Sequence, residues 1–211
     1  MKSLLFDLDG TLNESGEGIK KSVQYAYEQL GYEIPPFDTL DMFVGPPLRD
    51  SFVQRGIPAE QAELAIVKYR ERYTTIGIFE CAAYEGIYEL LQKLKEEGYR
   101  LFVATSKPEQ LAIRVLEHLK MDTYFEIIAG ATFDKSRDSK TQVIQYLLDQ
   151  AHIEEPVMVG DTKFDVTGAR KLDIPCIGVT WGYGTREEME VAGAYKIVDT
   201  MDELYNVIKE M

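Results

Sequence analysis

The sequence predicts an α/β fold, a doubly wound parallel sheet into which a helical subdomain is inserted. Short apolar runs alternate with amphipathic segments of helical period along most of the chain, and this alternation is typical of a parallel sheet covered by helices on both faces. Residues 17–79 break the alternation because they offer helical patterns with no strand between them. The insertion therefore follows the first strand.

Six apolar runs are predicted to be buried strands. Each is three to five residues long and is followed by a polar residue or a glycine, as expected of strands covered on both faces. The runs are Ser3–Phe6, Arg100–Ala104, Glu126–Ala129, Val157–Val159, Cys176–Val179 and Tyr195–Val198.

Three amphipathic segments between these runs are predicted to be helices that cover the sheet: Gly86–Glu97, Pro108–Leu119 and Lys140–Gln150. In each one, apolar residues recur three and four positions apart and form one buried face. Ile87, Leu90 and Leu94 are such a set in the first helix.

The insertion contains three further helical patterns: Gly18–Leu30, Leu48–Arg55 and Pro58–Tyr73. The first two stop at a glycine, a common helix terminator. We therefore predict an α/β core domain of residues 1–14 and 82–211, and a helical subdomain of residues 15–81.

Composition and charge limit the possible functions. The chain has 211 residues, 45% of them hydrophobic, and a net charge of −13. This charge argues against nucleic-acid partners and anionic membrane surfaces, which select basic proteins. No apolar run approaches the roughly 18 residues of a membrane span, and no signal-peptide pattern is seen. We expect a cytoplasmic protein without membrane partners, and the sequence leaves its oligomeric state open.

Acidic residues directly follow the first predicted strand. Asp7 and Asp9 are two positions apart and precede Gly10, so their negative charge is concentrated at a strand end, where ligands bind in doubly wound sheets. The pair indicates either a divalent-cation site or a simple acidic turn. An EF-hand loop fits less well, because Thr11 and Leu12 occupy its fifth and sixth positions.

Polar groups also follow two later strands. Thr105, Ser106 and Lys107 come after the second predicted strand, where they form either an anion-binding cradle or the cap of the next helix. Asp161 and Asp165 come after the fourth predicted strand. They are either metal ligands or parts of a turn followed by a helix cap.

A lysine near the start of a predicted helix is the remaining candidate. Lys140 follows Ser139 at the helix start, whereas Lys135 lies in a polar loop. A solvated surface lysine is the alternative interpretation. We favour Lys140 over Lys135 because the helix fixes its position.

Taken in chain order, these candidate residues resemble the four motifs of the haloacid dehalogenase-like superfamily. The matching elements are Asp7-x-Asp9-Gly10-Thr11, Thr105, Lys140 and Gly160-Asp161-x-x-x-Asp165. The helical insertion resembles the cap of its phosphoglycolate phosphatase, phosphomutase and nucleotidase branch. The resemblance implies a Rossmann-like core with an α-helical cap. It also implies a Mg²⁺-dependent phosphatase that hydrolyses a small-molecule phosphate monoester.

The resemblance assigns catalytic roles that agree with the needs of phosphoryl transfer. Asp7 is the expected nucleophile, which forms an aspartyl phosphate. Asp9 is expected to protonate the leaving oxygen and later to deprotonate water. Thr105 and Lys140 are expected to offset charge on the phosphate oxygens.

The metal ligands are expected to be the carboxylates of Asp7 and Asp161 and the backbone carbonyl of Asp9. Mg²⁺ suits such an all-oxygen site. Asp165 is a fourth candidate, which either contacts the metal or orients its neighbours.

Further residues are expected to bind substrate. The backbone of Gly10 and Thr11 should hold phosphate, with Ser106 and Lys107 beside it. Arg49 in the helical subdomain is a candidate substrate contact, with a surface arginine as the alternative.

One position departs from the family pattern. Glu14 stands where the family usually has aspartate. We expect its extra methylene to shift contacts at the cap hinge and so to affect cap closure or substrate preference, while the phosphoryl-transfer residues are untouched. Trp181 and Tyr183 follow the fifth predicted strand, and the sequence favours packing on the sheet over a place in the site.

Three other functions compete with hydrolysis. A sugar phosphomutase would use the same Asp7 and Asp9 but return the phosphoryl group to substrate, and the cap sequence Gly45–Leu48 favours a phosphatase. A dehalogenase would lack Asp9, since it has no leaving alkoxide to protonate. A phospho-aspartate signalling switch is a distant alternative. Phosphoglycolate and nucleoside monophosphates are the leading substrate candidates.

Overall fold

The computed structural model describes residues 2–211, which form two compact units. The sheet unit contains the residues up to Asn13 together with Ala83–Met211, and the helical unit is Glu14–Ala82. A small two-stranded sheet, β2 (Asn13–Glu14) and β3 (Ala82–Ala83), lies where the chain passes between the units. These limits differ by one residue from the predicted boundaries.

The sheet unit is built on a six-stranded parallel sheet with strand order β5–β4–β1–β6–β7–β8. The order and direction confirm the predicted α/β class. Each predicted run overlaps a strand, although Glu126 and Tyr195, the first residues of their runs, lie outside the strands. The strands are β1 (Ser3–Phe6), β4 (Arg100–Pro108), β5 (Ile127–Ala131), β6 (Pro156–Gly160), β7 (Cys176–Val179) and β8 (Lys196–Val198).

Strand β4 is longer than predicted. Its length excludes helix capping as the role of the polar residues near its end. It runs through Pro108, with a shift in its register to β5 after Ala104, and α5 begins only at Glu109. Lys107 precedes a proline, which disfavours helical backbone, so the extended chain continues to that point. Thr105 and Ser106 therefore lie within β4, and the interpretation of them as helix caps is wrong.

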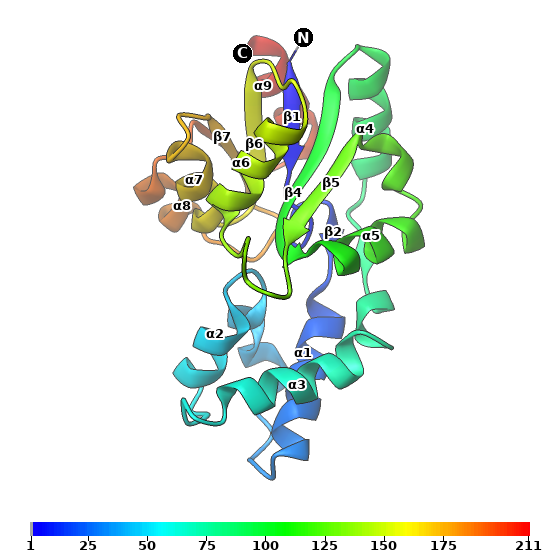
Figure 1. Cartoon of the computed structure of the whole chain (residues 1–211). Helices are drawn as coiled ribbons and strands as arrows, with labels where there is room; N and C mark the ends of the chain where they lie inside the picture. Colours follow the sequence, from blue (N-terminus) through cyan, green and yellow to red (C-terminus); the bar gives the residue numbers. More distant parts are fainter. Residues whose placement is uncertain (1) are drawn as a thin grey trace. The chain divides into compact units, whose positions relative to one another are not determined.

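Helices cover both faces of the sheet. Those of the sheet unit are α4 (Ile87–Glu96), α5 (Glu109–His118), α6 (Lys140–Gln150), α7 (Lys163–Arg170), α8 (Arg186–Ala192) and α9 (Met201–Glu210). Figure 1 shows α4 and α5 on one side of the sheet and α6, α7 and α8 on the other. The predicted helix patterns do not include α7, α8 or α9.

The change of face follows from the path of the chain. From β1 the chain moves outward to β4 and β5, and then returns to β6 on the other side of β1. Right-handed crossovers in opposite directions put their helices on opposite faces. The reversal lies between β1 and β6, and the ends of these neighbouring strands form the crevice where such sheets bind ligands.

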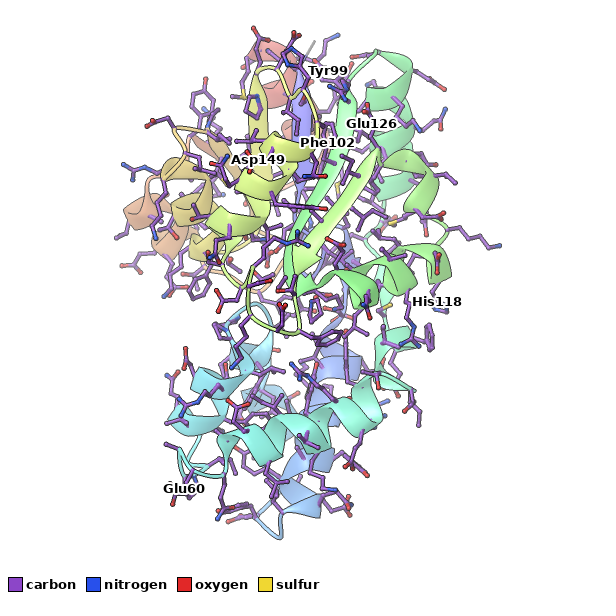
Figure 2. All side chains as sticks on the ribbon, viewed as in Figure 1. Glu60, Tyr99, Phe102, His118, Glu126 and Asp149 are labelled. Atoms are coloured by element: carbon purple, nitrogen blue, oxygen red, sulfur yellow. The ribbon has the colours of Figure 1, made fainter. Side chains whose placement is uncertain are left out.

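Apolar side chains fill the space between the sheet and the helices. One buried cluster joins residues of the strands with residues of α6, α7 and α8, namely Leu5, Phe102, Ala104, Ala129, Val143, Ile144, Leu147, Met158, Val166, Ala169, Ile174, Cys176 and Met189. Figure 2 labels Phe102 in this interior, whereas Glu126 and Asp149 are exposed. This packing holds the ends of β1, β4 and β6 in a fixed register.

The helical unit contains α1 (Gly16–Gln29), α2 (Leu48–Gln54) and α3 (Ala62–Tyr73). Its interior is aromatic, since the ring centroids of Phe43 and Phe52 are 5.0 Å apart. The third helix starts later than predicted because Pro58–Gln61 forms a turn, in which Gln61 N donates to Pro58 O at 2.8 Å. Across residues 2–211, no helix combines the length and apolar character needed to cross a membrane.

Candidate active site

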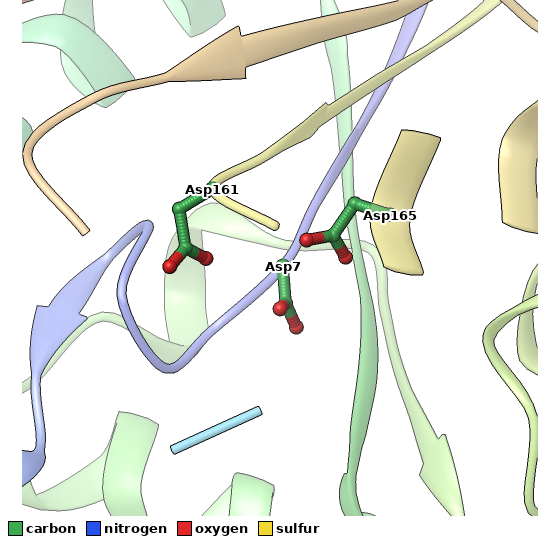
Figure 3. Close-up of side chains that lie close together, drawn as sticks. All are labelled: Asp7, Asp161 and Asp165. Carbon is green, nitrogen blue, oxygen red and sulfur yellow. The ribbon is translucent and has the colours of Figure 1, made fainter. Parts of the chain in front are cut away.

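Three buried carboxylates converge at the reversal point of the sheet. Asp7 follows β1, Asp161 follows β6, and Asp165 lies in the first turn of α7. Figure 3 shows their side chains around a common space, and one oxygen from each lies within 4.8 Å of the others. Their exposed fractions are 7%, 0% and 0%.

Lys140 is the cation of this cluster. Its Nζ lies 2.8 Å from Asp7 Oδ1 and 2.7 Å from Asp165 Oδ1, and it donates to Ala104 O at 2.8 Å. Its three ammonium hydrogens therefore have three acceptors in a buried place, and two of these acceptors are charged.

Local structure explains why this lysine occupies the site. Ser139 and Gln142 form a capping box that fixes the start of α6. Gly168 of α7 leaves room for the lysine stem, because a Cβ there would lie 2.7 Å from Lys140 Cβ. Lys135 is instead exposed in the preceding loop, at φ 62°. The structure thus brings Lys140 to Asp7 and leaves Lys135 outside.

The cluster has more negative than positive charge. Burial raises the pKa of Asp7 to about 6, although Lys140 opposes the rise. Burial, followed by the charges of Asp165 and Asp7, raises the pKa of Asp161 well above its usual range. Burial lowers the pKa of Lys140, but the two neighbouring carboxylates outweigh it and raise that pKa overall. Three carboxylates beside one ammonium suit a divalent cation with oxygen ligands.

Asp161 is held by hydrogen bonds to both of its oxygens. Thr11 Oγ1 donates to Oδ1 at 3.1 Å, and the backbone N–H of Tyr183 donates to Oδ2 at 2.8 Å. Gly10 lies against the same carboxylate at φ 88°, and a Cβ on it would be 2.2 Å from Oδ2. Only glycine suits that position, both for its backbone angle and for space.

Asp165 makes different contacts. Its Oδ2 accepts hydrogen bonds from the backbone N–H of Thr162 at 3.0 Å and from Thr162 Oγ1 at 2.8 Å, and its Oδ1 pairs with Lys140. Gly160 makes space for it, since a Cβ there would lie 2.3 Å from Asp165 Cγ. Both of its oxygens are thus already engaged in holding Lys140 and the start of α7.

Asp9 and Lys107 form another ion pair that is largely shielded from solvent. Lys107 Nζ lies 2.5 Å from Asp9 Oδ2, and the two side chains are only 5% and 13% exposed. Asp9 Oδ1 is buried without a hydrogen-bond partner among the described residues. Thr105 is also buried, and its Oγ1 accepts from Lys107 N at 3.2 Å, while the neighbouring Ser106 is half-buried.

The backbone N–H groups of Gly10 and Thr11 form hydrogen bonds within the turn that follows β1. Gly10 N donates to Asn13 O at 2.9 Å, and Thr11 N donates to Leu8 O at 3.2 Å. Both N–H groups are used within the turn that follows β1, and Thr11 Oγ1 is used by Asp161. That the backbone of Gly10 and Thr11 holds phosphate stays a prediction, and in this structure both N–H groups already have a partner within the turn.

Two residues of the helical unit were also singled out by the sequence. Arg49 lies on α2, is 48% exposed on its side chain, and has its Nε 3.6 Å from Glu63 Oε1. Glu14 Oε1 accepts from Gly16 N at 3.1 Å at the start of α1. A role of Arg49 in substrate binding stays a prediction.

The loop after β7 contributes contacts at the site that the sequence motifs do not predict. Trp181 Nε1 donates to Thr11 O at 3.1 Å, and Tyr183 supplies the N–H on Asp161. The favoured interpretation of these aromatic residues as sheet packing alone is therefore corrected. Gly182 and Gly184 alternate with these aromatic residues just after a predicted strand. Glycines in such a place indicate a close approach of the backbone to another segment.

Known proteins resemble the chain over most of its length. A model of the haloacid dehalogenase-like hydrolase family matches residues 4–179. A 5′-nucleotidase of Pseudomonas aeruginosa is 40% identical over 190 residues, 89% of this chain and 86% of its own. The tyrosine-protein kinase PtkA of Mycobacterium tuberculosis is 40% identical over 205 residues, 95% and 70% of the two chains. A phosphoglycolate phosphatase of Colwellia psychrerythraea is 27% identical over 217 residues, 98% and 96% of the two chains.

A solved structure shows the same architecture. The crystal structure of a predicted phosphatase from Clostridium acetobutylicum has 42% sequence identity and a TM-score of 0.94, over 100% of this chain and 99% of that one. The match of the family model covers well over half of the chain, and it includes the ends of β1, β4 and β6, where the acidic cluster and Thr105 lie. The chain therefore belongs to the haloacid dehalogenase-like hydrolase family.

Proposed function

We propose that the protein is a Mg²⁺-dependent phosphatase that hydrolyses a small-molecule phosphate monoester through an aspartyl phosphate on Asp7. The observation that carries this proposal is the buried cluster at the end of β1, where Asp7 lies 2.8 Å from Lys140 and close to Asp161. Names of the relatives, a 5′-nucleotidase and a phosphoglycolate phosphatase among them, support the same reaction class.

Mg²⁺ fits the donor set of this cluster. Asp7 and Asp161 would hold it through carboxylate oxygens, with the backbone carbonyl of Asp9 as a further ligand. Asp165, whose oxygens are engaged by Thr162 and Lys140, would orient the lysine. When bound, the ion would supply positive charge near the phosphate oxygens.

In the first half of the reaction, an Asp7 carboxylate oxygen attacks phosphorus and the bond to the ester oxygen breaks. Asp9 gives a proton to the departing oxygen, which leaves as an alcohol. In the second half, Asp9 takes a proton from water, whose oxygen attacks the same phosphorus. The bond to Asp7 then breaks, inorganic phosphate leaves, and both carboxyl groups return to their initial states.

The remaining polar groups would bind the phosphoryl group. Thr105 and Ser106 at the end of β4 offer hydroxyls, and Lys140 offsets charge beside Asp7. Lys107 is paired with Asp9, which favours a role in holding that carboxylate over the predicted role in substrate binding. The proposal includes a cytoplasmic location and excludes nucleic-acid and membrane partners, as the sequence predicts.

The phosphoryl group could be passed to an acceptor other than water. A sugar phosphomutase would transfer it to a sugar hydroxyl, and the relative named as a tyrosine-protein kinase makes transfer to a tyrosine hydroxyl a second candidate. Both alternatives use the same Asp7 intermediate. They differ from hydrolysis in whether inorganic phosphate is released.

The test is phosphate release in the presence of Mg²⁺ from phosphoglycolate, nucleoside monophosphates, sugar phosphates and pyridoxal phosphate. We expect release from one substrate class, loss of activity with EDTA, and loss in Asp7→Asn. Circular dichroism should show that this variant is folded, because the substitution hardly changes volume. Full activity of folded Asp7→Asn would contradict the mechanism, and silence of the wild type on the whole panel would favour a transferase.

A further inference from the structure

The loop that follows β7, Thr180–Thr185, contacts the acidic cluster although it contributes no carboxylate to it. Its Tyr183 N–H donates to Asp161 Oδ2 at 2.8 Å. The opposite oxygen of Asp161 accepts from Thr11 Oγ1 at 3.1 Å. A donor on each oxygen fixes the plane of the carboxylate and leaves further lone pairs for another ligand.

Glycines in this loop allow the backbone to approach Asp161 closely. A Cβ on Gly182 would lie 2.3 Å from Asp161 Oδ2 and 2.4 Å from Gly10 O. A Cβ on Gly184 would lie 2.1 Å from the backbone oxygen of Asp161. Any side chain at position 182 would therefore enter the space between the aspartate and the turn after β1.

Trp181 connects the two residues, Thr11 and Tyr183, that donate hydrogen bonds to Asp161. Its indole Nε1 donates to Thr11 O at 3.1 Å, and Thr11 is the residue whose hydroxyl binds Asp161 Oδ1. Two positions after Trp181, Tyr183 binds Oδ2. These hydrogen bonds form a ring of contacts, in which the indole of Trp181 fixes the turn after β1 relative to the loop after β7.

We infer that Trp181 is a positioning residue for the metal site, which sets the orientation of the Asp161 carboxylate through Thr11 and the Tyr183 backbone. The inference rests on the proposed function, in which Asp161 holds Mg²⁺. Residues that orient metal ligands by hydrogen bonds commonly change metal affinity about 10–100-fold when they are replaced. Trp181 does this indirectly, so the effect should lie near the lower limit.

The test is titration of the EDTA-stripped protein with Mg²⁺ alone, followed by calorimetry, without substrate. Trp181→Phe keeps an aromatic ring but removes the indole donor, and we expect its Kd for Mg²⁺ to rise about tenfold. Gly182→Ala should weaken binding further. Tyr205→Phe is the matched control, because it removes the hydroxyl with which Tyr205 of α9 binds Glu97 at the end of α4, and its affinity should equal that of the wild type.

The outcomes separate this inference from the proposed function. A wild-type protein that binds no Mg²⁺ overturns the metal site itself. Wild-type affinity in folded Trp181→Phe overturns only the role of Trp181. Trp181 is the single tryptophan of the chain, so Mg²⁺ binding should change its fluorescence in the wild type. Calorimetric binding without any fluorescence change would also contradict the coupling.

Discussion

Lys107 at the end of β4 is paired with Asp9, three residues beyond β1, with its Nζ 2.5 Å from Asp9 Oδ2. The two residues are 98 positions apart in the sequence and meet because β1 and β4 are parallel neighbours. Little solvent reaches the pair, so screening of its attraction is weak. The pair keeps Asp9 beside the expected nucleophile, where a proton-transfer group is needed.

Replacement of Lys107 by methionine should separate its two possible roles. If the lysine holds Asp9, Lys107→Met lowers kcat about tenfold or more and leaves KM within about threefold, because misplaced acid–base groups lose catalytic efficiency. Steady-state kinetics measure both constants. Lys171→Met is the control, since this lysine is exposed. A large rise in KM with an unchanged kcat would instead show that Lys107 binds substrate.

Replacement of Lys140 should affect both activity and stability. Lys140→Met leaves Asp7 and Asp165 buried without a counter-charge, and loss of one partner from a buried pair costs about 3–5 kcal/mol. We expect urea denaturation in the absence of metal to show this loss, and turnover to be abolished. Lys135→Met, in the exposed loop, should change neither. An inactive Lys135→Met with an active Lys140→Met would reverse the assignment.

Asp161 and Asp165 should differ in their effect on metal affinity. Asp161→Asn removes a proposed ligand, so the Kd for Mg²⁺ should rise about 100-fold or more, by analogy with other ligand networks. Asp165→Asn disturbs the contact with Lys140, so turnover should fall about tenfold while the Kd changes less than about threefold. Calorimetric titration with Mg²⁺ gives both affinities. An equal rise in the Kd for Mg²⁺ in the two variants would make Asp165 a direct ligand.

The contribution of Asp7 to the stability of the metal-free protein should fall as the pH rises from about 4 to 6. Burial raises the pKa of Asp7 from 3.8 to about 6 in the folded state, so in this window the folded protein holds a proton that the unfolded chain has lost. The free energy of unfolding therefore falls with rising pH, by up to about 3 kcal/mol for this group. Urea denaturation in EDTA measures the change.

Asp7→Asn provides the comparison that isolates this effect. The variant lacks the titrating carboxyl group, whereas the other acidic groups titrate in both proteins. Its stability should fall less than that of the wild type across the same window. Parallel curves for the two proteins would show that Asp7 does not take up a proton on folding.

The local sequence determined the architecture of the sheet unit and the place of most of its chemistry. Apolar runs of three to five residues marked every strand of the sheet, because strands buried on both faces admit few polar residues. Parallel strands end at one edge, so the polar residues after β1 and β6 had to meet there. This reasoning predicted Asp7 and Asp161, whereas Lys140 was predicted from its place at the start of a helix.

Other contacts depended on how distant segments pack, and no local pattern contains that information. Trp181 and Thr11 are 170 positions apart, and their hydrogen bond exists only because the loop after β7 crosses the turn after β1. The same turn pairs the N–H groups of Gly10 and Thr11 internally, and the residue types alone do not reveal this pairing. Residue type and strand position thus identified the groups at the site, while tertiary packing decided which partner each hydrogen-bonding atom obtained.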